Sequence, residues 1–118
     1  MSSVTIYHNP RCNSSRQTLA LLEAHGFTPK VIEYLKTPPT VAELKKILTQ
    51  LHCTPRELMR TKEAIYSTLQ LDNPKLNEDT LLQAMHDHPI LIQRPIVIMG
   101  RNACIARPPE TLLEMINT

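Results

Sequence analysis

A cysteine in a polar turn is the residue of this sequence best suited to chemistry. Cys12 lies in the segment HNPRCNSSR, residues 8–16, between a short apolar run and a helical pattern. At the start of a helix, free backbone N–H groups and the positive end of the helix dipole favour a thiolate. The same environment attracts anions. The segment therefore predicts an activated cysteine beside an oxyanion site, with Arg11 and Arg16 as supporting positive charge.

The spacing Cys12-x-x-Ser15 is a one-thiol version of the Cys-x-x-Cys redox motif. A serine cannot resolve a mixed disulfide, so the second sulfur has to come from elsewhere. We expect the Ser15 hydroxyl to hydrogen-bond the Cys12 thiolate, although a serine at this position can also simply cap the helix. The alternative for Cys12 is a small buried hydrophobe, which is the usual role of a cytosolic cysteine. The polar residues on both sides of Cys12 argue against that role.

The elements that position Cys12 follow from apolar periodicity and turn signals. Strands are predicted at residues 4–7, 30–34, 96–99 and 104–106, and helices at 14–24, 41–51, 55–60, 62–69, 78–87 and 108–116. The first strand, helix and strand form a βαβ unit, whose two strands should be parallel. The last two strands should form an antiparallel hairpin that turns at Gly100. The sequence thus predicts an α/β fold of the order βαβ…ββα, with a helical insertion at about 37–92.

Length and composition limit the classes of function. The 118 residues are enough for one domain, and the formal net charge is only +2. Four aromatic residues, none of them Trp, argue against nucleic acid as a partner, and no stretch suggests a membrane partner. The three cysteines lie far apart without metal-ligand spacing, so we expect no metal and no bound cofactor. The N-terminus lacks the pattern of a signal peptide, which makes the cytoplasm the expected location.

The sequence resembles the glutathione- and glutaredoxin-coupled arsenate reductases of bacteria, over essentially the whole chain. The resemblance is carried by YHNP-x-C-x-x-SR at 7–16, ELMR at 57–60, RPIV at 94–97 and RPPE at 107–110. It implies a single domain over residues 1–118 with a thioredoxin-like mixed sheet. It also implies that Pro95, which in such folds faces the active cysteine, has a cis peptide bond.

The resemblance implies roles for five residues. Cys12 is the implied nucleophile, His8 is the residue that holds it as a thiolate, and Arg60, Arg94 and Arg107 form the implied oxyanion clamp. Ser15 is a further candidate catalytic residue, and Asn13 and Ser14 are further candidate substrate-binding residues. Guanidinium groups suit this task because they bind anionic oxygens bidentately and stay charged at any working pH. Taken singly, each of these arginines would be interpreted as a solvated surface charge.

The implied reaction, a part of arsenical resistance, is the reduction of arsenate to arsenite. The Cys12 thiolate attacks arsenic and forms a covalent adduct. Glutathione, as co-substrate, then supplies the second thiol, and glutaredoxin removes the mixed disulfide. The need for an external thiol agrees with the serine at position 15.

Two alternatives stay open at this point, and a third is disfavoured. The chain could be a redox-responsive regulator of the same fold that binds RNA polymerase, although Ser15 removes the Cys-x-x-Cys switch that such proteins commonly carry. It could also be a paralogue that acts on another oxyanion or thiol substrate, because arginines recognise charge and oxygens rather than arsenic. A cysteine phosphatase would need an arginine where Thr18 stands.

The other two cysteines are expected to be inert packing residues. Cys53 lies in a helix break and Cys104 in the last predicted strand. Residues 104 and 107 of a continuous strand would face opposite sides of the sheet, which would separate Cys104 from Arg107. A redox role for Cys104 nevertheless stays open, because other arsenate reductases use a second cysteine of their own chain.

Overall fold

The computed structural model describes residues 3–116, which divide into two compact units. The first unit is built from both ends of the chain, up to Thr37 and from Arg94 onward. The second unit is the intervening segment Pro38–Gln93. The single domain expected from the sequence stays a prediction.

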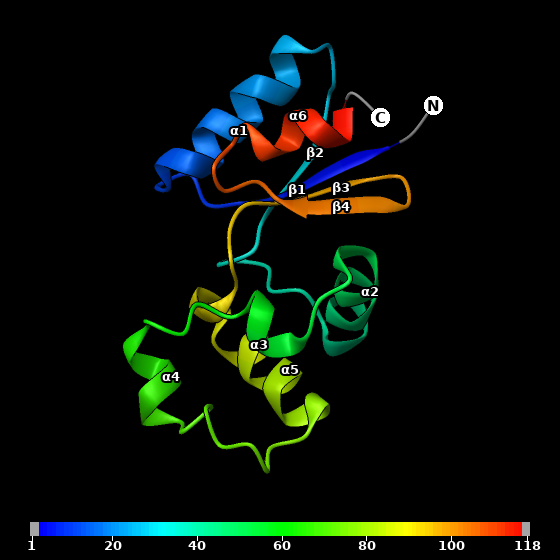
Figure 1. Ribbon diagram of the computed structural model, residues 1–118. Coiled ribbons are helices and arrows are strands. Elements are labelled where there is room, and N and C mark those ends of the chain that lie inside the picture. The colour runs from blue at the N-terminus through cyan, green and yellow to red at the C-terminus, as the bar shows by residue number, and fades with distance from the viewer. Residues whose placement is uncertain (1–2, 117–118) are drawn as a thin grey trace. The chain divides into compact units, whose positions relative to one another are not determined.

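The first unit contains a mixed four-stranded sheet (Figure 1). Its strands are β1 (Val4–His8), β2 (Lys30–Glu33), β3 (Ile96–Met99) and β4 (Asn102–Ile105), in the spatial order β2-β1-β3-β4. β1 pairs with β2 in parallel and with β3 antiparallel, and β3 and β4 form an antiparallel hairpin. The predicted order βαβ…ββα is therefore confirmed, with β4 beginning two residues before the predicted strand.

Helices α1 (Asn13–Ala24) and α6 (Thr111–Ile116) lie on the same side of this sheet (Figure 1). The apolar core beneath them consists of Val4, Ile6, Leu22, Val97, Ala106 and Leu112. Side chains alternate along a strand, so His8 at the end of β1 shares the face of Val4 and Ile6. The core-facing side of β1 therefore ends in a histidine next to the turn that leads into α1.

The second unit is helical, as predicted. Its elements are α2 (Val41–Leu51), α3 (Pro55–Leu58), α4 (Ala64–Thr68), α5 (Glu78–Asp87) and a 3₁₀ turn, η1 (Pro89–Leu91). The capping boxes predicted at Thr40 and Thr54 are both formed, and Asn77 caps α5. Helix α5 packs against α2, α3 and η1. The sequence pattern did not indicate η1, because a three-residue turn is too short for apolar periodicity.

Two further features concern the C-terminal part of the chain. The predicted cis peptide bond at Arg94–Pro95 is present, and Arg107–Pro108 is also cis. α6 begins at Thr111 rather than at Pro108, since Pro108 and Pro109 belong to hydrogen-bonded turns before the helix.

Across the described part of the chain, no helix is both long enough and apolar enough to cross a bilayer.

Candidate active site at the start of helix α1

A tight turn connects β1 to α1 and places Cys12 at the N-cap of the helix. The Cys12 N–H donates to the Asn9 carbonyl oxygen at 2.9 Å, which closes the turn. The Arg11 N–H donates to the Asn9 side-chain oxygen at 3.0 Å. Asn at the first and Pro10 at the second position of such a turn are favoured because Asn bonds its own backbone and Pro presets φ. The sequence Asn9-Pro10 therefore explains locally why the chain reverses in front of Cys12.

The Cys12 sulfur lies where its ionised form is favoured. The side chain is 9% exposed, and this burial by itself would raise the pKa of Cys12. The backbone N–H of Ser15, the guanidinium of Arg94 and the backbone N–H of Ser14 all favour the thiolate. Together they outweigh burial, so the pKa of Cys12 lies below its ordinary value.

Ser15 is fully buried and links the turn to His8. Its hydroxyl oxygen accepts the Asn9 N–H at 3.0 Å and lies 2.6 Å from His8 Nδ1. From the sequence, this hydroxyl is predicted to bond the sulfur of Cys12. In the structure, Ser15 instead acts on the sulfur through its backbone amide, because its hydroxyl is engaged by His8 and Asn9. His8 therefore influences Cys12 through Ser15.

The charge of His8 depends on three opposing influences. Burial lowers the pKa of His8, Glu33 raises it, and Arg16 lowers it. The net direction is downward, so the imidazole is mainly neutral at pH 7. In that state Nδ1 is the acceptor and the Ser15 hydroxyl is the donor, an assignment inferred from the bonding pattern. At neutral pH, His8 thus supplies a hydrogen bond to the site rather than a positive charge.

The structure places the three predicted clamp arginines in different surroundings. Arg94 precedes β3, and its guanidinium hydrogen-bonds the Cys12 sulfur. Its Nε is buried and has no hydrogen-bond partner within residues 3–116. Arg107 follows β4 with an exposed side chain. Arg60 lies in the second unit, where its Nη1 is 2.6 Å from the carboxylate of Glu63. Of the three arginines, the structure thus brings Arg94 to the sulfur, while the roles of the other two stay predictions.

The polar residues of the first turn of α1 stabilise the backbone around Cys12. Arg16 donates to the Pro10 carbonyl oxygen at 2.8 Å and to the Asn13 side-chain oxygen at 3.4 Å. These bonds tie the turn to the helix, so Arg16 holds the loop in addition to carrying charge. Substrate binding by Asn13 and Ser14 stays a prediction. For Ser14, the structure supports a different role: its backbone N–H favours the thiolate form of Cys12.

The two other cysteines lack these activating surroundings. Cys104 pairs with Val97 in the β3–β4 hairpin and packs against the core of the first unit. Its burial, and to a lesser degree Glu114, raise the pKa of Cys104 to about 11. Burial also raises the pKa of Cys53. Strand alternation does not separate Cys104 from Arg107 as predicted, because β4 ends at Ile105 and Arg107 lies beyond it.

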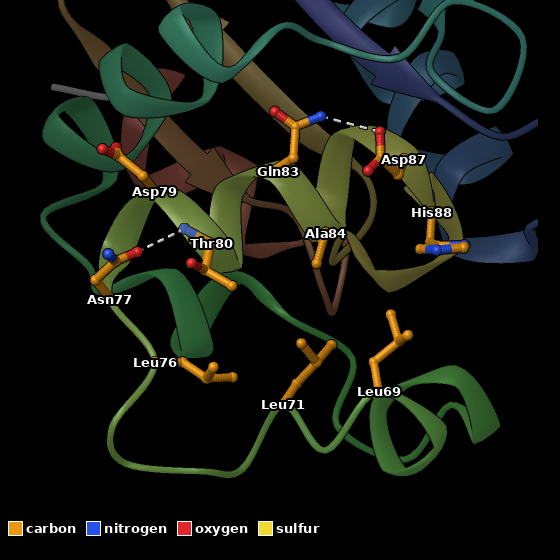
Figure 2. A pocket seen from close by; sticks show the side chains of 10 residues that line it. All are labelled: Leu69, Leu71, Leu76, Asn77, Asp79, Thr80, Gln83, Ala84, Asp87 and His88. Carbon is orange, nitrogen blue, oxygen red and sulfur yellow. Dashed lines mark hydrogen bonds between the residues drawn. The ribbon is translucent and has the colours of Figure 1, made fainter.

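A separate cavity of about 540 Å³ lies in the second unit (Figure 2). Its apolar side chains include Leu69, Leu71, Leu76 and Ala84, the last of these on α5. Among the described residues that line it, none is a predicted site residue, and none is a cysteine. Within residues 3–116, no group of three or more His, Cys, Asp or Glu side chains could hold a metal ion. The lining of the cavity therefore offers no thiol, and the residues suited to redox chemistry are those of the turn around Cys12.

We predict that Cys12 is the first cysteine to be alkylated in the native protein. A lowered pKa means a larger thiolate fraction at a given pH, so the rate at Cys12 should reach its plateau at a lower pH than that of free cysteine, whose pKa is about 8.5. The rates at Cys53 and Cys104 should rise only at higher pH, because their pKa values are raised. The measurement is residue-resolved mass spectrometry with iodoacetamide from pH 5 to 10. Faster labelling of Cys53 or Cys104 at pH 7 would contradict this assignment.

Comparison with known proteins identifies the family. Residues 7–115 match the ArsC family. The chain is 49% identical over 115 residues to an arsenate reductase of Haemophilus influenzae, across 97% of this chain and 99% of that protein. A solved structure named as a putative arsenate reductase from Yersinia pestis is 58% identical, with a TM-score of 0.91 over 95% of this chain and 99% of that chain. An arsenate reductase from Vibrio cholerae is 51% identical, with a TM-score of 0.93 over 96% of this chain and 97% of that chain. These structures confirm the predicted α/β, thioredoxin-like fold, and the chain belongs to the ArsC family.

Proposed function

We propose that this chain is an arsenate reductase, an oxidoreductase in which the Cys12 thiolate attacks arsenate. Membership of the ArsC family and the names of its relatives support the activity. The observation that carries the assignment to this site is the contact of the Arg94 guanidinium with the Cys12 sulfur. A buried guanidinium N–H without a partner is costly unless an acceptor is supplied. An oxyanion held beside the sulfur supplies that acceptor.

The proposed reaction begins with the sulfur of Cys12. The thiolate forms an As–S bond, and one As–O bond breaks, with the oxygen leaving as water after protonation. The sulfur of glutathione then bonds the sulfur of Cys12, and the electron pair of the As–S bond passes to arsenic. Arsenic(V) becomes arsenic(III) and is released as arsenite. A thiol of glutaredoxin takes over the glutathionyl group and returns Cys12 to the thiolate.

The residues around Cys12 have distinct parts in this scheme. Arg94 offsets the negative charge on the arsenate oxygens, which increases as the sulfur approaches. The backbone N–H groups of Ser14 and Ser15 hold the sulfur as a thiolate before attack. Arg60 and Arg107 are proposed to complete the substrate site, as the family resemblance implies, and Asn13 is proposed as a further substrate-binding residue. Glutathione as the electron source accords with a location in the cytoplasm and with a role in arsenical resistance.

An external electron source predicts that the other two cysteines are dispensable. Cys53→Ala and Cys104→Ala, tested separately, should keep turnover within about twofold of the unmodified protein, because surface and packing changes away from the reacting atoms rarely alter chemistry. Arsenite production is measured with glutathione and glutaredoxin present. Loss of turnover in Cys104→Ala, with thermal unfolding unchanged, would show that the chain contains its own resolving thiol.

The direct test is arsenite production from arsenate, measured with glutathione and glutaredoxin each present or omitted. We expect turnover only when both are present. Arsenate should also protect Cys12 from alkylation, whereas sulfate at the same ionic strength should protect it less. If Cys12 is protected equally by several oxyanions and no arsenite forms, the chain is a paralogue with another oxyanion substrate. Capture of RNA polymerase by the protein, unchanged by Cys12→Ser, would favour the regulatory alternative.

A further inference from the structure

Glu33 lies beside His8, although the two residues are far apart in sequence. β1 and β2 are parallel, and His8 and Glu33 are partners in their register. Partners in paired strands carry their side chains on the same face of the sheet, close enough to interact. His8 is 6% exposed, while the Glu33 side chain is 42% exposed at the outer strand β2. A buried imidazole therefore has a half-exposed carboxylate as its lateral neighbour.

The hydrogen bond between His8 and Ser15 makes the charge of His8 relevant to Cys12. The Ser15 hydroxyl oxygen already accepts the Asn9 N–H, so only the direction in which the hydroxyl hydrogen points can change. When His8 is neutral, this hydrogen is donated to Nδ1. When His8 is an imidazolium, Nδ1–H donates to the hydroxyl oxygen, and the hydroxyl hydrogen is no longer held by Nδ1. Charging His8 thus frees a donor and adds a positive charge in the turn that holds Cys12.

We propose that Glu33 is a positioning residue that favours the imidazolium form of His8 and so controls which partner of the His8–Ser15 hydrogen bond donates the proton. The inference rests on the proposed function only in taking Cys12 as the reactive sulfur. It concerns no atom of arsenate, so it can be tested without turnover.

Other charged groups around His8 determine how strong this control is. Arg16, on α1, opposes the imidazolium. Lys36 pairs with Glu33, with its Nζ 3.6 Å from the Glu33 carboxylate, and partly neutralises it. Because Glu33 is half exposed and paired, its influence on His8 is moderate and decreases with salt.

The test is the titration of the His8 ring followed by NMR in the full chain, with His8→Asn used to identify its signal among the five histidines. Glu33→Gln should lower the pKa of His8 by roughly 0.3–0.7, the range expected for one cross-strand charge pair. Lys36→Gln should shift it upward, because the Glu33 carboxylate is then no longer neutralised. Glu23→Gln is the matched control, since it removes the same charge from an exposed position on α1. High salt should diminish both shifts.

A second measurement links the titration to the reactive sulfur. At pH 6, Glu33→Gln should slow iodoacetamide labelling of Cys12 by about two- to threefold, and Lys36→Gln should accelerate it. At pH 8 the variants should label alike, because His8 is then neutral in all of them. A His8 pKa that moves equally in Glu33→Gln and Glu23→Gln, or labelling differences that persist at pH 8, would overturn the proposal. Because Lys36 is 78% exposed, its variant keeps the test informative even if Glu33→Gln disturbs β2. If these shifts occur but no arsenite forms, the proposed function fails and the inference stands.

Discussion

Replacing Cys12 by serine is expected to lower arsenite production by about 10,000-fold or more, the scale of loss seen when a covalent nucleophile is removed. The backbone amides and the guanidinium around position 12 lower the pKa of a thiol into a useful range. A hydroxyl group is far less acidic, so the same surroundings leave serine protonated. It also cannot form a disulfide with glutathione, so the reducing step is lost together with the attack. The measurement is turnover with arsenate, glutathione and glutaredoxin at saturating thiol.

The loss should come from chemistry and not from the fold. Cys12 contributes a side chain at the edge of the core, and serine is a favourable N-cap residue, so the free energy of unfolding should change little. Cys53→Ser is the matched control, since it removes a thiol whose pKa is raised. Turnover above one per cent of the unmodified level in Cys12→Ser would contradict the nucleophile assignment.

The parts of the fold that the sequence predicts well are those set by local signals. The Asn9-Pro10 turn, the caps at Thr40 and Thr54 and the cap at Asn77 each depend on residues within four positions of one another. The βαβ order follows from alternating short strand and helix patterns. These features appear in the structure with boundaries shifted by a residue or two. The 3₁₀ turn after α5 is missing from the prediction because three residues are too few to show a repeating apolar pattern.

The site was harder to predict because its side chains meet through long-range pairing. Cys12 and its polar turn could be identified locally, whereas nothing local indicates that Arg94 reaches the sulfur, and the family resemblance alone implied it. Glu33 was missed because its position beside His8 depends on the register of two strands, which a sequence pattern does not fix. The pairing of Arg60 with Glu63 could have been expected from their spacing of three residues.

Replacing Arg94 by alanine is expected to lower kcat/KM for arsenate by about 100- to 1,000-fold, the usual effect of removing one preorganised donor from an anionic reaction centre. Two losses combine in this variant. Without the guanidinium, the pKa of Cys12 rises, so less thiolate is present at pH 7. The developing charge on the arsenate oxygens also loses its partner. The first loss is measured by alkylation of Cys12 against pH, and the second by turnover at a pH where Cys12 is fully ionised.

Arg94→Lys separates these two losses. A lysine restores positive charge near the sulfur but not the planar fork of donors, so it should recover much of the lowered pKa of Cys12 and little of the turnover. Arg101→Ala is the matched control, because Arg101 is exposed just beyond the other end of β3. Arg94→Ala should also leave the free energy of unfolding unchanged or raise it. The reason is that the buried Nε of Arg94 lacks an acceptor, and the variant removes this unsatisfied donor. A variant that is strongly destabilised but retains full turnover would mark Arg94 as a structural residue, and the oxyanion site would have to be sought elsewhere.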